Sequence, residues 1–419
     1  MPYIIGLGST AFTKHSDRSF HELTREAVTA ALKDTGLDTP HRLDSIVVGN
    51  CAMHAWKQAN IRGQVLMTPL QNDGLIEKGT PIVNVEAGCA TGILAFHTAL
   101  SHILSGMSEL SLAFGIEKLT FPDDPKMMKS FPLFAGGIDQ LTPKSWLQHY
   151  PQCAQEEGLD FQPDPRRLIF LDVHALQAMY ALKKGWVDVN DIAAVASKNH
   201  CNGTHNPLAQ YRFDMTPEAV LADRPIVPPL TRSMCAPLSD GAAAIVICSD
   251  AFYKTLPQQT QRSAIRIRAC TLQGGQYRSL SAPDLVHHAA KKAFSHAQLT
   301  PSDIQMVELH DSTAFCEIKH LISLGISSEA HIQHDIQSGR FHADGACPVN
   351  RSGGLISKGH PLGATGLGML YELTQQMRGA AGPHQVSTPI RYAAAHNGGG
   401  LVGLDEALCG VTLLENPHA

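Results

Sequence analysis

The sequence lacks the patterns by which metal sites and disulfide scaffolds are most readily recognised. Its ten cysteines contain no CxxC pair and no zinc-ligand spacing, and its twenty-two histidines form no HExxH motif. Scattered cysteines without these spacings favour a reduced, intracellular protein, so we expect a cytoplasmic location and no bound metal. The formal net charge of −5 argues against nucleic acid as the main partner.

Signals for membrane insertion and export are also missing. The sequence has no run of eighteen apolar residues, which argues against a membrane span. Residues 1–8 are apolar but lack a basic front, so they predict a strand and not a signal peptide. The sequence does contain enough hydrophobic residues to form a large core. The 419 residues, 43% hydrophobic and 17% charged, are typical of an enzyme with two or three domains.

Strands and helices are expected to alternate through residues 1–120. The periodicity predicts strands over 3–8, 43–48, 82–85 and 110–114, and helices over 19–35, over 58–70 and after Cys89. This order indicates α/β layers around a partly parallel sheet. Residues 121–229 interrupt the pattern with many prolines, a predicted helix over 167–185 and a predicted loop over 199–216, and we interpret them as an inserted loop domain.

An internal repeat links the two ends of the sequence. Residues 27–49 resemble residues 289–310, and GCATGILAFHTAL (88–100) resembles LGATGLGMLYELT (362–374). The same elements therefore recur in the same order about 260–275 residues apart, which predicts two copies of one α/β unit. We expect one copy in residues 1–120 with 230–260, the other in 261–419, and a ligand at the seam between them.

Cys89 stands where a buried strand is predicted to give way to a helix. Unpaired backbone N–H groups and the positive end of the helix dipole favour a thiolate at such a position. A thiolate there suits covalent acyl transfer. The alternative is a small buried cysteine that only fills the junction.

Three histidines follow predicted strands or turns in the second copy. His310 ends the strand of ELHD, His360 lies in a glycine-rich turn, and His396 precedes three glycines. A nucleophilic thiol needs a base nearby, and acyl chemistry needs N–H donors around the carbonyl oxygen. Glycine turns bring backbone N–H groups close to a substrate. Together these residues indicate an acyl-transfer site.

The sequence resembles the thiolases, and most closely the sterol-carrier-protein-type branch. The motifs that carry the resemblance are VNVEAGCATG (83–92), GIEK (115–118), CAPLSDGAAA (235–244), ELHD (308–311), NRSGGLISKGHPLGATG (350–366) and HNGGG (396–400). The resemblance implies a duplicated, five-layered α-β-α-β-α thiolase fold with an inserted loop domain that contacts coenzyme A. It also implies a homodimer or higher oligomer.

The chemistry that the resemblance implies is acyl transfer between CoA thioesters. A carbon–carbon bond of a 3-oxoacyl-CoA would be made or broken, with the coenzyme A thioester as substrate and no permanently bound cofactor. By the same resemblance Cys89 is the acylated nucleophile, and His360 accepts its proton. His310 would hold a substrate oxygen, and Gly399 and Cys89 would offer backbone N–H groups to the acyl oxygen.

The sequence departs from the resemblance at the second acid/base, which is usually a cysteine. His396 and Ser312 occupy the two places where that cysteine is found. A serine hydroxyl is a poor base, whereas an unperturbed imidazole has a pKa of about 6.5. We therefore predict that His396, with help from His310, moves the α-proton, and that Ser312 and Asn397 contact the substrate.

Two alternatives remain open at this stage. The protein would transfer acyl groups to an unusual acceptor, with Cys316, one helical turn past Ser312, as a further candidate. Otherwise it would be a thiolase-like subunit that needs a small zinc-ribbon/OB-fold partner. Within the insert, Arg212, Arg224 and Arg232 either meet the phosphates of coenzyme A or are surface residues, and Trp146 and Tyr150 either line an acyl pocket or pack inside the insert.

Overall fold

The computed structural model describes residues 1–38, 42–121, 123–124, 136–164 and 166–419. Part of the predicted insert, including both prolines of the sequence FPDDP, lies outside these residues. The strands are β1 (Tyr3–Ser9), β2 (Ser45–Gly49), β3 (Ile82–Val85), β4 (Leu110–Glu117), β5 (Pro225–Val227), β6 (Leu230–Thr231), β7 (Gly241–Cys248), β8 (Ile265–Gly274), β9 (Met306–Leu309), β10 (Tyr392–Gly399) and β11 (Leu408–Glu415).

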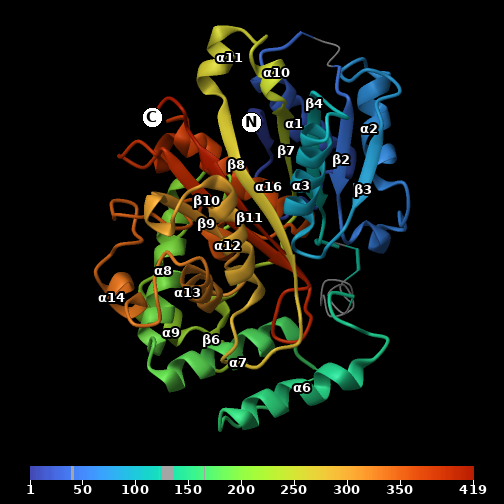
Figure 1. Ribbon diagram of the computed structural model, residues 1–419. Helices are drawn as coiled ribbons and strands as arrows, with labels where there is room; N and C mark the ends of the chain where they lie inside the picture. Colours follow the sequence, from blue (N-terminus) through green and yellow to red (C-terminus); the bar gives the residue numbers. More distant parts are fainter. Residues whose placement is uncertain (39–41, 122, 125–135, 165) are drawn as a thin grey trace.

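The helices lie in three groups along the chain (Figure 1). Those before the insert are α1 (Phe20–Asp34), α2 (Arg62–Asn72) and α3 (Thr91–Leu104). Those between β4 and β7 are α6 (Pro143–Glu156), α7 (Ile169–Lys184), α8 (Val189–His205) and α9 (Pro217–Ala222). Those after β7 are α10 (Asp250–Tyr253), α11 (Gln258–Ser263), α12 (Leu285–Ala297), α13 (Ala314–Ser323), α14 (Ile332–Gln337), α15 (Gly354–Lys358) and α16 (Leu362–Met377).

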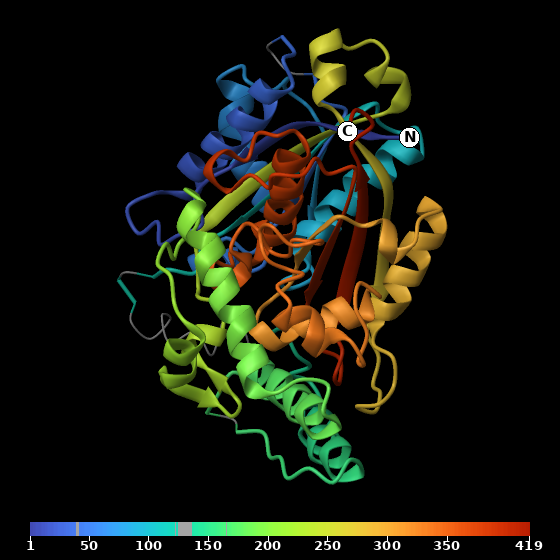
Figure 2. The same ribbon diagram turned by 90° about the vertical axis from the view of Figure 1, so that its left-hand side faces the viewer.

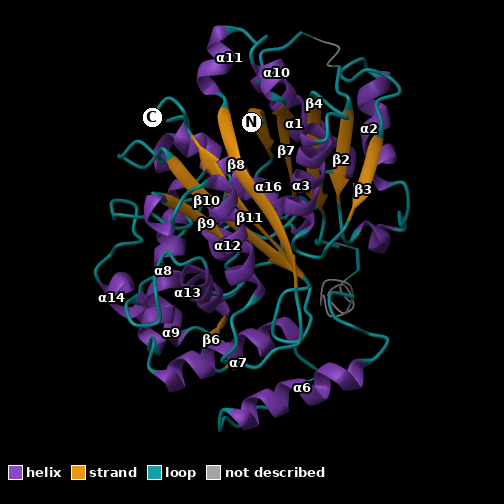
Figure 3. Cartoon of the chain, viewed as in Figure 1, coloured by secondary structure: helices purple, strands orange, loops and turns teal. Residues whose placement is uncertain are grey.

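The strand order reveals the duplication. The sheet runs β3-β2-β4-β7-β1-β8-β11-β10-β9, so β2-β4-β7-β1 is matched by β9-β10-β11-β8 read from the other edge (Figure 3). In both halves the first of these pairs is parallel and the next two are antiparallel. Within the sheet the two halves are joined by β1 and β8, through the register pairs Tyr3–Arg266 and Ile4–Ile265. The repeat predicted from the sequence is therefore present in the topology.

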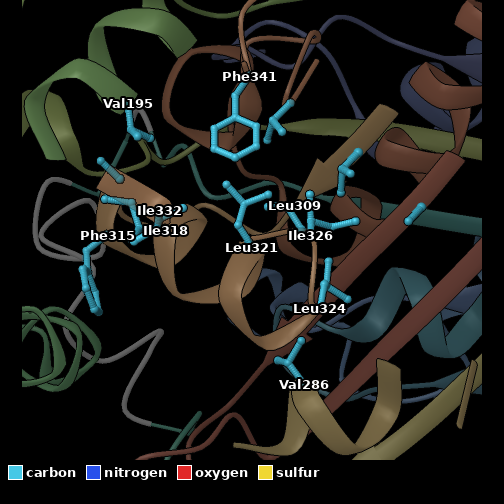
Figure 4. Close-up of a cluster of buried hydrophobic side chains, with 14 of the residues drawn as sticks. Val195, Val286, Leu309, Phe315, Ile318, Leu321, Leu324, Ile326, Ile332 and Phe341 are labelled. Carbon is cyan, nitrogen blue, oxygen red and sulfur yellow. The ribbon is translucent and has the colours of Figure 1, made fainter. Parts of the chain in front are cut away.

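Alternating side chains on the strands build the layers. On β10, Ala393 and Ala395 belong to a central core with residues of α3 and α16, whereas Ala394 belongs to an outer core with residues of α12 and α13. Figure 4 shows part of this outer core, including Val286 of α12 and Leu321 of α13. Residues of α1 and α2 form the corresponding outer core of the first half. The result is the five-layered α-β-α-β-α thiolase fold, with α3 and α16 between the two halves of the sheet.

Small residues allow the two central helices to approach closely. A Cβ placed on Gly92 of α3 would lie 2.9 Å from the backbone nitrogen of Gly366 on α16. Real Cβ atoms do not approach so near. The glycines of the GCATG and GATG segments therefore allow α3 of one copy to pack directly against α16 of the other. This contact sets Cys89, just before α3, beside the turns of the second copy.

Several boundaries differ from the predictions, and one of them is that of α2, which begins at Arg62 and not at residue 58. The loop predicted over 199–216 is wrong at its start, because α8 continues to His205. The polar Asn199 on α8 is fully buried and donates to the carboxylates of Asp311 and Glu317, so its polarity reflects buried partners and not a loop. Strand β4 also extends past residue 114, since residues up to Glu117 pair with β7.

Helices α6 and α7 lie at the end of the molecule opposite the two chain termini (Figures 1 and 2). Among the described residues, no helix is long and apolar enough to cross a membrane.

Candidate active site

Cys89 and two of the predicted histidines meet at one point. Cys89 lies in the turn between β3 and α3, His310 directly follows β9, and His360 precedes α16. The Cys89 sulfur and one ring nitrogen of each histidine lie within 4.8 Å of one another. The imidazoles stand edge to face with centroids 5.1 Å apart. All three side chains line one cavity of about 100 Å³, so the seam between the two copies brings them together.

Glycines of the HNGGG motif press against the turn of Cys89. A Cβ on Gly399 would lie 2.4 Å from the Cys89 nitrogen, and a Cβ on Gly88 would lie 2.9 Å from the Gly400 nitrogen. Any side chain at Gly399 would force this turn away. The predicted donors of an oxyanion hole, the backbones of Cys89 and Gly399, are therefore adjacent.

The resting state of Cys89 differs from the prediction. Burial, together with the charges of Glu117 and Glu406, raises the pKa of the Cys89 thiol to about 12. The expected preference for a thiolate is therefore wrong. The helix end is outweighed because the protein around the sulfur solvates a thiolate less well than water does. A thiol in this state needs a base to become a nucleophile.

His360 presents a bare nitrogen to the cavity. The Thr365 hydroxyl donates to the carbonyl oxygen of Pro361 at 3.0 Å, so it must accept from His360 Nδ1–H at 2.8 Å. The proton therefore sits on Nδ1, and Nε2, which has no hydrogen-bond partner within the described chain, carries a lone pair. Burial lowers the pKa of His360 to about 3, so the ring is neutral near pH 7. This is the tautomer that can take a proton from a thiol.

His310 has the opposite tautomer. The Asn397 amide donates to the carbonyl oxygen of Cys89 at 3.1 Å and to His310 Nδ1 at 2.9 Å. Nδ1 is therefore the acceptor, and Nε2 carries the proton. Burial and the neighbouring His360 lower the pKa of His310 well below its ordinary value. His310 can thus donate one neutral hydrogen bond, and Asn397 holds it in place from behind.

His396 is not among the described residues that line this cavity. Its partners in the sheet register are Leu309 and Val411, both in the outer core, and its ring lies 4.2 Å from that of His320. It is fully buried, and burial followed by His320 lowers the pKa of His396 well below its ordinary value. The expectation of an ordinary imidazole pKa is therefore wrong.

The other predicted side chains have distinct surroundings. Ser312 lines the cavity, and its hydroxyl contacts the sulfur of Cys316 at 3.7 Å. Cys316 is buried behind it, with Thr313 Oγ1 at 3.2 Å, and does not line the cavity in the described structure.

The aromatic residues of the insert pack together. Trp146 and Tyr150 lie in a hydrophobic cluster with Phe161, and the Tyr150 hydroxyl donates to the carbonyl oxygen of Gly403 at 2.9 Å. Of the two alternatives for Trp146 and Tyr150, packing against neighbouring residues is therefore the one observed. Arg212, Arg224 and Arg232 are exposed, and Arg232 pairs with Asp223 at 2.9 Å.

Sequence reasoning missed part of the cavity wall. Phe170, Leu171 and His174 reach it from α7, and Glu406 reaches it from the loop between β10 and β11. The helix over 167–185 was predicted, but its periodicity does not show which face meets the second copy. A second, larger cavity of about 390 Å³ also borders Cys89 and is lined in part by Cys51, His54 and Arg62.

Fold and site together define an acyltransferase of the thiolase type. The family model described as "Thiolase, N-terminal domain" matches residues 3–221, and "Thiolase C-terminal domain-like" matches residues 272–408. The chain therefore belongs to the thiolase family, whose members use CoA thioesters as substrates.

Known relatives cover nearly the whole chain. It is 31% identical over 408 residues to the acetyl-CoA acetyltransferase of Methanothermobacter thermautotrophicus, with 96% of each chain covered. It is 27% identical over 402 residues to the benzoylsuccinyl-CoA thiolase subunit BbsB of Thauera aromatica, covering 95% of this chain and 94% of the relative. Among solved structures, the Ltp2-ChsH2(DUF35) aldolase matches with a TM-score of 0.75 at 20% identity, covering 99% of this chain and 98% of that one.

Proposed function

We propose that this protein makes or breaks a carbon–carbon bond of a 3-oxoacyl-CoA through an acyl-enzyme on Cys89. The observation that carries the proposal is the convergence of the Cys89 sulfur with ring nitrogens of His310 and His360 within 4.8 Å. Membership of the thiolase family supports the same chemistry.

In the first half-reaction His360 Nε2 accepts the thiol proton of Cys89, and the sulfur attacks the thioester carbonyl. The coenzyme A thiolate then leaves and takes the proton from His360. The geometry supports this order because the thiol is neutral at rest and a ring nitrogen of His360 lies within 4.8 Å of the sulfur. Proton transfer of this kind contributes about 10²–10⁴-fold to a rate.

Negative charge on the acyl oxygen needs donors that are already in place. We propose the backbone N–H groups of Cys89 and Gly399 for the acyl-enzyme, and His310 Nε2–H for the oxygen of the second substrate. Removal of one such donor costs about 2.7–4 kcal/mol of barrier in other enzymes. Asn397 would then position His310 without touching the substrate itself.

The direct test is the mass of the intact protein after incubation with acetyl-CoA or a longer acyl-CoA. We expect one acyl group on the wild-type chain and none on Cys89→Ala. Cys201→Ala is the matched control, because Cys201 is exposed and outside the cavity, and it should acylate normally. An adduct that survives in Cys89→Ala would contradict the proposal.

The assembly is a separate part of the proposal. We propose a homodimer or higher oligomer, residues 121–229 as the insert that contacts coenzyme A, and a reducing cytoplasmic compartment, which the ten free cysteines support. We also propose a small zinc-ribbon/OB-fold partner, and the similarity to a solved structure described as an Ltp2-ChsH2(DUF35) aldolase supports it. Light scattering tests the oligomer. A chain that acylates only after such a partner is added would establish the partner.

A further inference from the structure

The cavity around Cys89 needs a second group that moves a proton, and its obvious candidates are unsuitable. Ser312 offers only a hydroxyl, and His396 lies outside the cavity wall in the described structure. Among the described residues of that wall there is one carboxylate, Glu406. We propose that Glu406 is the acid/base at the α-carbon of the second substrate, an inference that rests on the proposed thiolase-type function.

The backbone brings Glu406 to the cavity through a tight loop between β10 and β11. The Ala407 N–H donates to the carbonyl oxygen of Gly399 at 2.9 Å, and Val402 bridges Asp405. The Asp405 carboxylate is buried and pairs with Arg278 at 2.6 Å. These contacts fix the chain on both sides of Glu406, so its side chain has a defined starting point.

A glycine makes room for the side chain to reach inward. A Cβ placed on Gly398 would lie 2.8 Å from Cγ and 3.0 Å from Cδ of Glu406. The side chain of Glu406 therefore packs directly against Gly398, and any side chain at that position would displace it. The adjacent Gly399 gives the same freedom to Cys89, so neighbouring glycines serve the nucleophile and the carboxylate separately.

One carboxylate oxygen is held and the other is free. His320 Nε2 lies 3.1 Å from Oε1 of Glu406, while Oε2 is buried and has no hydrogen-bond partner within the described residues. The ring of His396 lies beside that of His320 at a tilt of 58°, and one ligand atom from each of His320, His396 and Glu406 lies within 4.8 Å of the others. A buried oxygen without a partner is costly, so such a group is retained where a substrate or a proton completes it.

The surrounding charges keep the carboxyl group of Glu406 ionised. Burial by itself would raise the pKa of Glu406, but the charge of Lys319 and the hydrogen bond from His320 outweigh it and lower that pKa well below its usual value. Lys319 in turn pairs with Asp284 at 3.4 Å. The ionised carboxylate therefore faces the cavity near pH 7.

In the condensation direction the step balances as follows. Glu406 Oε2 takes the α-proton of the acceptor thioester, and the C–H electron pair forms the enolate, whose oxygen His310 Nε2–H stabilises. The enolate carbon bonds to the acyl carbon on Cys89, the C–S bond breaks, and the thiolate of Cys89 regains the proton from Glu406. In cleavage the same carboxyl group protonates the leaving enolate carbon. His320 and His396 act as positioning residues.

Hydrogen–deuterium exchange at the methyl group of acetyl-CoA in D2O measures this step apart from acylation. Glu406→Gln should still acylate at Cys89 within about twofold of wild type and should lose exchange by about 10²–10⁴-fold. Glu406→Asp should recover part of the exchange. Glu218→Gln on the exposed side of α9 is the matched control and should change neither reaction.

The outcomes separate the two proposals. If Glu406→Gln acylates and exchanges like wild type, the role of Glu406 is wrong although the acyl-enzyme stands. If wild-type chain exchanges protons but never acylates at Cys89, the proposed function fails. A stoichiometric metal ion in the purified chain that His396→Ala removes would overturn the acid/base role, because the ion would occupy the free oxygen of Glu406.

Discussion

Replacing Thr365 by valine tests whether the hydrogen bond behind His360 sets the chemistry of Cys89. The two side chains have the same shape, so the change removes one hydroxyl and little volume. That hydroxyl accepts from His360 Nδ1–H at 2.8 Å while it donates to the carbonyl oxygen of Pro361. Without the acceptor, His360 gains by moving its proton to Nε2, where it can no longer accept the proton of Cys89.

The magnitude follows from the cost of a buried donor without a partner. A cost of about 1–3 kcal/mol shifts the tautomer ratio by about 5-fold to 150-fold toward the unreactive form. We therefore expect the rate of Cys89 acylation to fall by a factor in that range, measured by quenched-flow mass spectrometry under single-turnover conditions. Binding of coenzyme A should change little, because Thr365 is buried and does not line the cavity in the part of the chain that the structure describes.

Thr374→Val is the matched control on the same helix. The Thr374 hydroxyl is also buried, but it has no hydrogen-bond partner among the described residues, so its loss should leave acylation within about twofold of wild type. Equal losses in both variants would mean that packing of α16 and not the tautomer is responsible. Full activity in Thr365→Val would refute the assignment of His360 as the base.

Two further predictions concern stability and the glycine motif. Burial lowers the pKa of His360 to about 3, and burial with Lys319 lowers that of His174 to about 4, so the unfolded chain binds more protons between those values and pH 6.5. As the pH drops below 6.5, the free energy of unfolding, measured with urea, should therefore decrease by up to about 1.4 kcal/mol per pH unit for each of these histidines. His174→Gln should make this dependence on pH less steep. A free energy of unfolding that stays constant from pH 7 to 5 would contradict the prediction. Gly398→Ala should displace Glu406 and lower the rate of α-proton exchange about tenfold or more, while Cys89 still becomes acylated. Gly274→Ala is the control, because a Cβ at Gly274 meets no atom within 4 Å, and it should change neither reaction. Unchanged exchange in Gly398→Ala would count against the role of Glu406.

Much of the fold follows from local patterns in the sequence. Ser19 begins α1 with a capping box that includes Glu22, and the predicted helix over 19–35 is observed over Phe20–Asp34. The repeat of small residues around Gly92 and Gly366 predicts the contact of the central helices. The error in α8 has a different origin, since Asn199 is paired with residues more than one hundred positions away, and no local pattern contains such partners.

The sequence predicts the convergence of Cys89, His310 and His360. Each of them stands next to a strand or helix of the repeat, and the two copies of the repeat are expected to meet at a common seam. The protonation states were not predictable, because they depend on hydrogen bonds from Thr365 and Asn397 and on burial. The residues of α7 that line the cavity were also not predictable, because the face that a helix presents to a distant sheet depends on packing between the two copies.

The case of His396 shows that a residue at a matching position of a motif need not place its side chain in the active-site cavity. Residues along a strand alternate between its two faces, so the side chain of Asn397 at the Cys89 side requires that of His396 to point to the outer core. A residue can thus replace the expected cysteine in the sequence without replacing it in the cavity. The acidic residue that lines the cavity, Glu406, comes nine residues past Asn397 and packs against Gly398, and only the return of the loop to β11 brings it there. The acid/base is therefore better sought among the groups that share a wall with the nucleophile than among those that share a motif position.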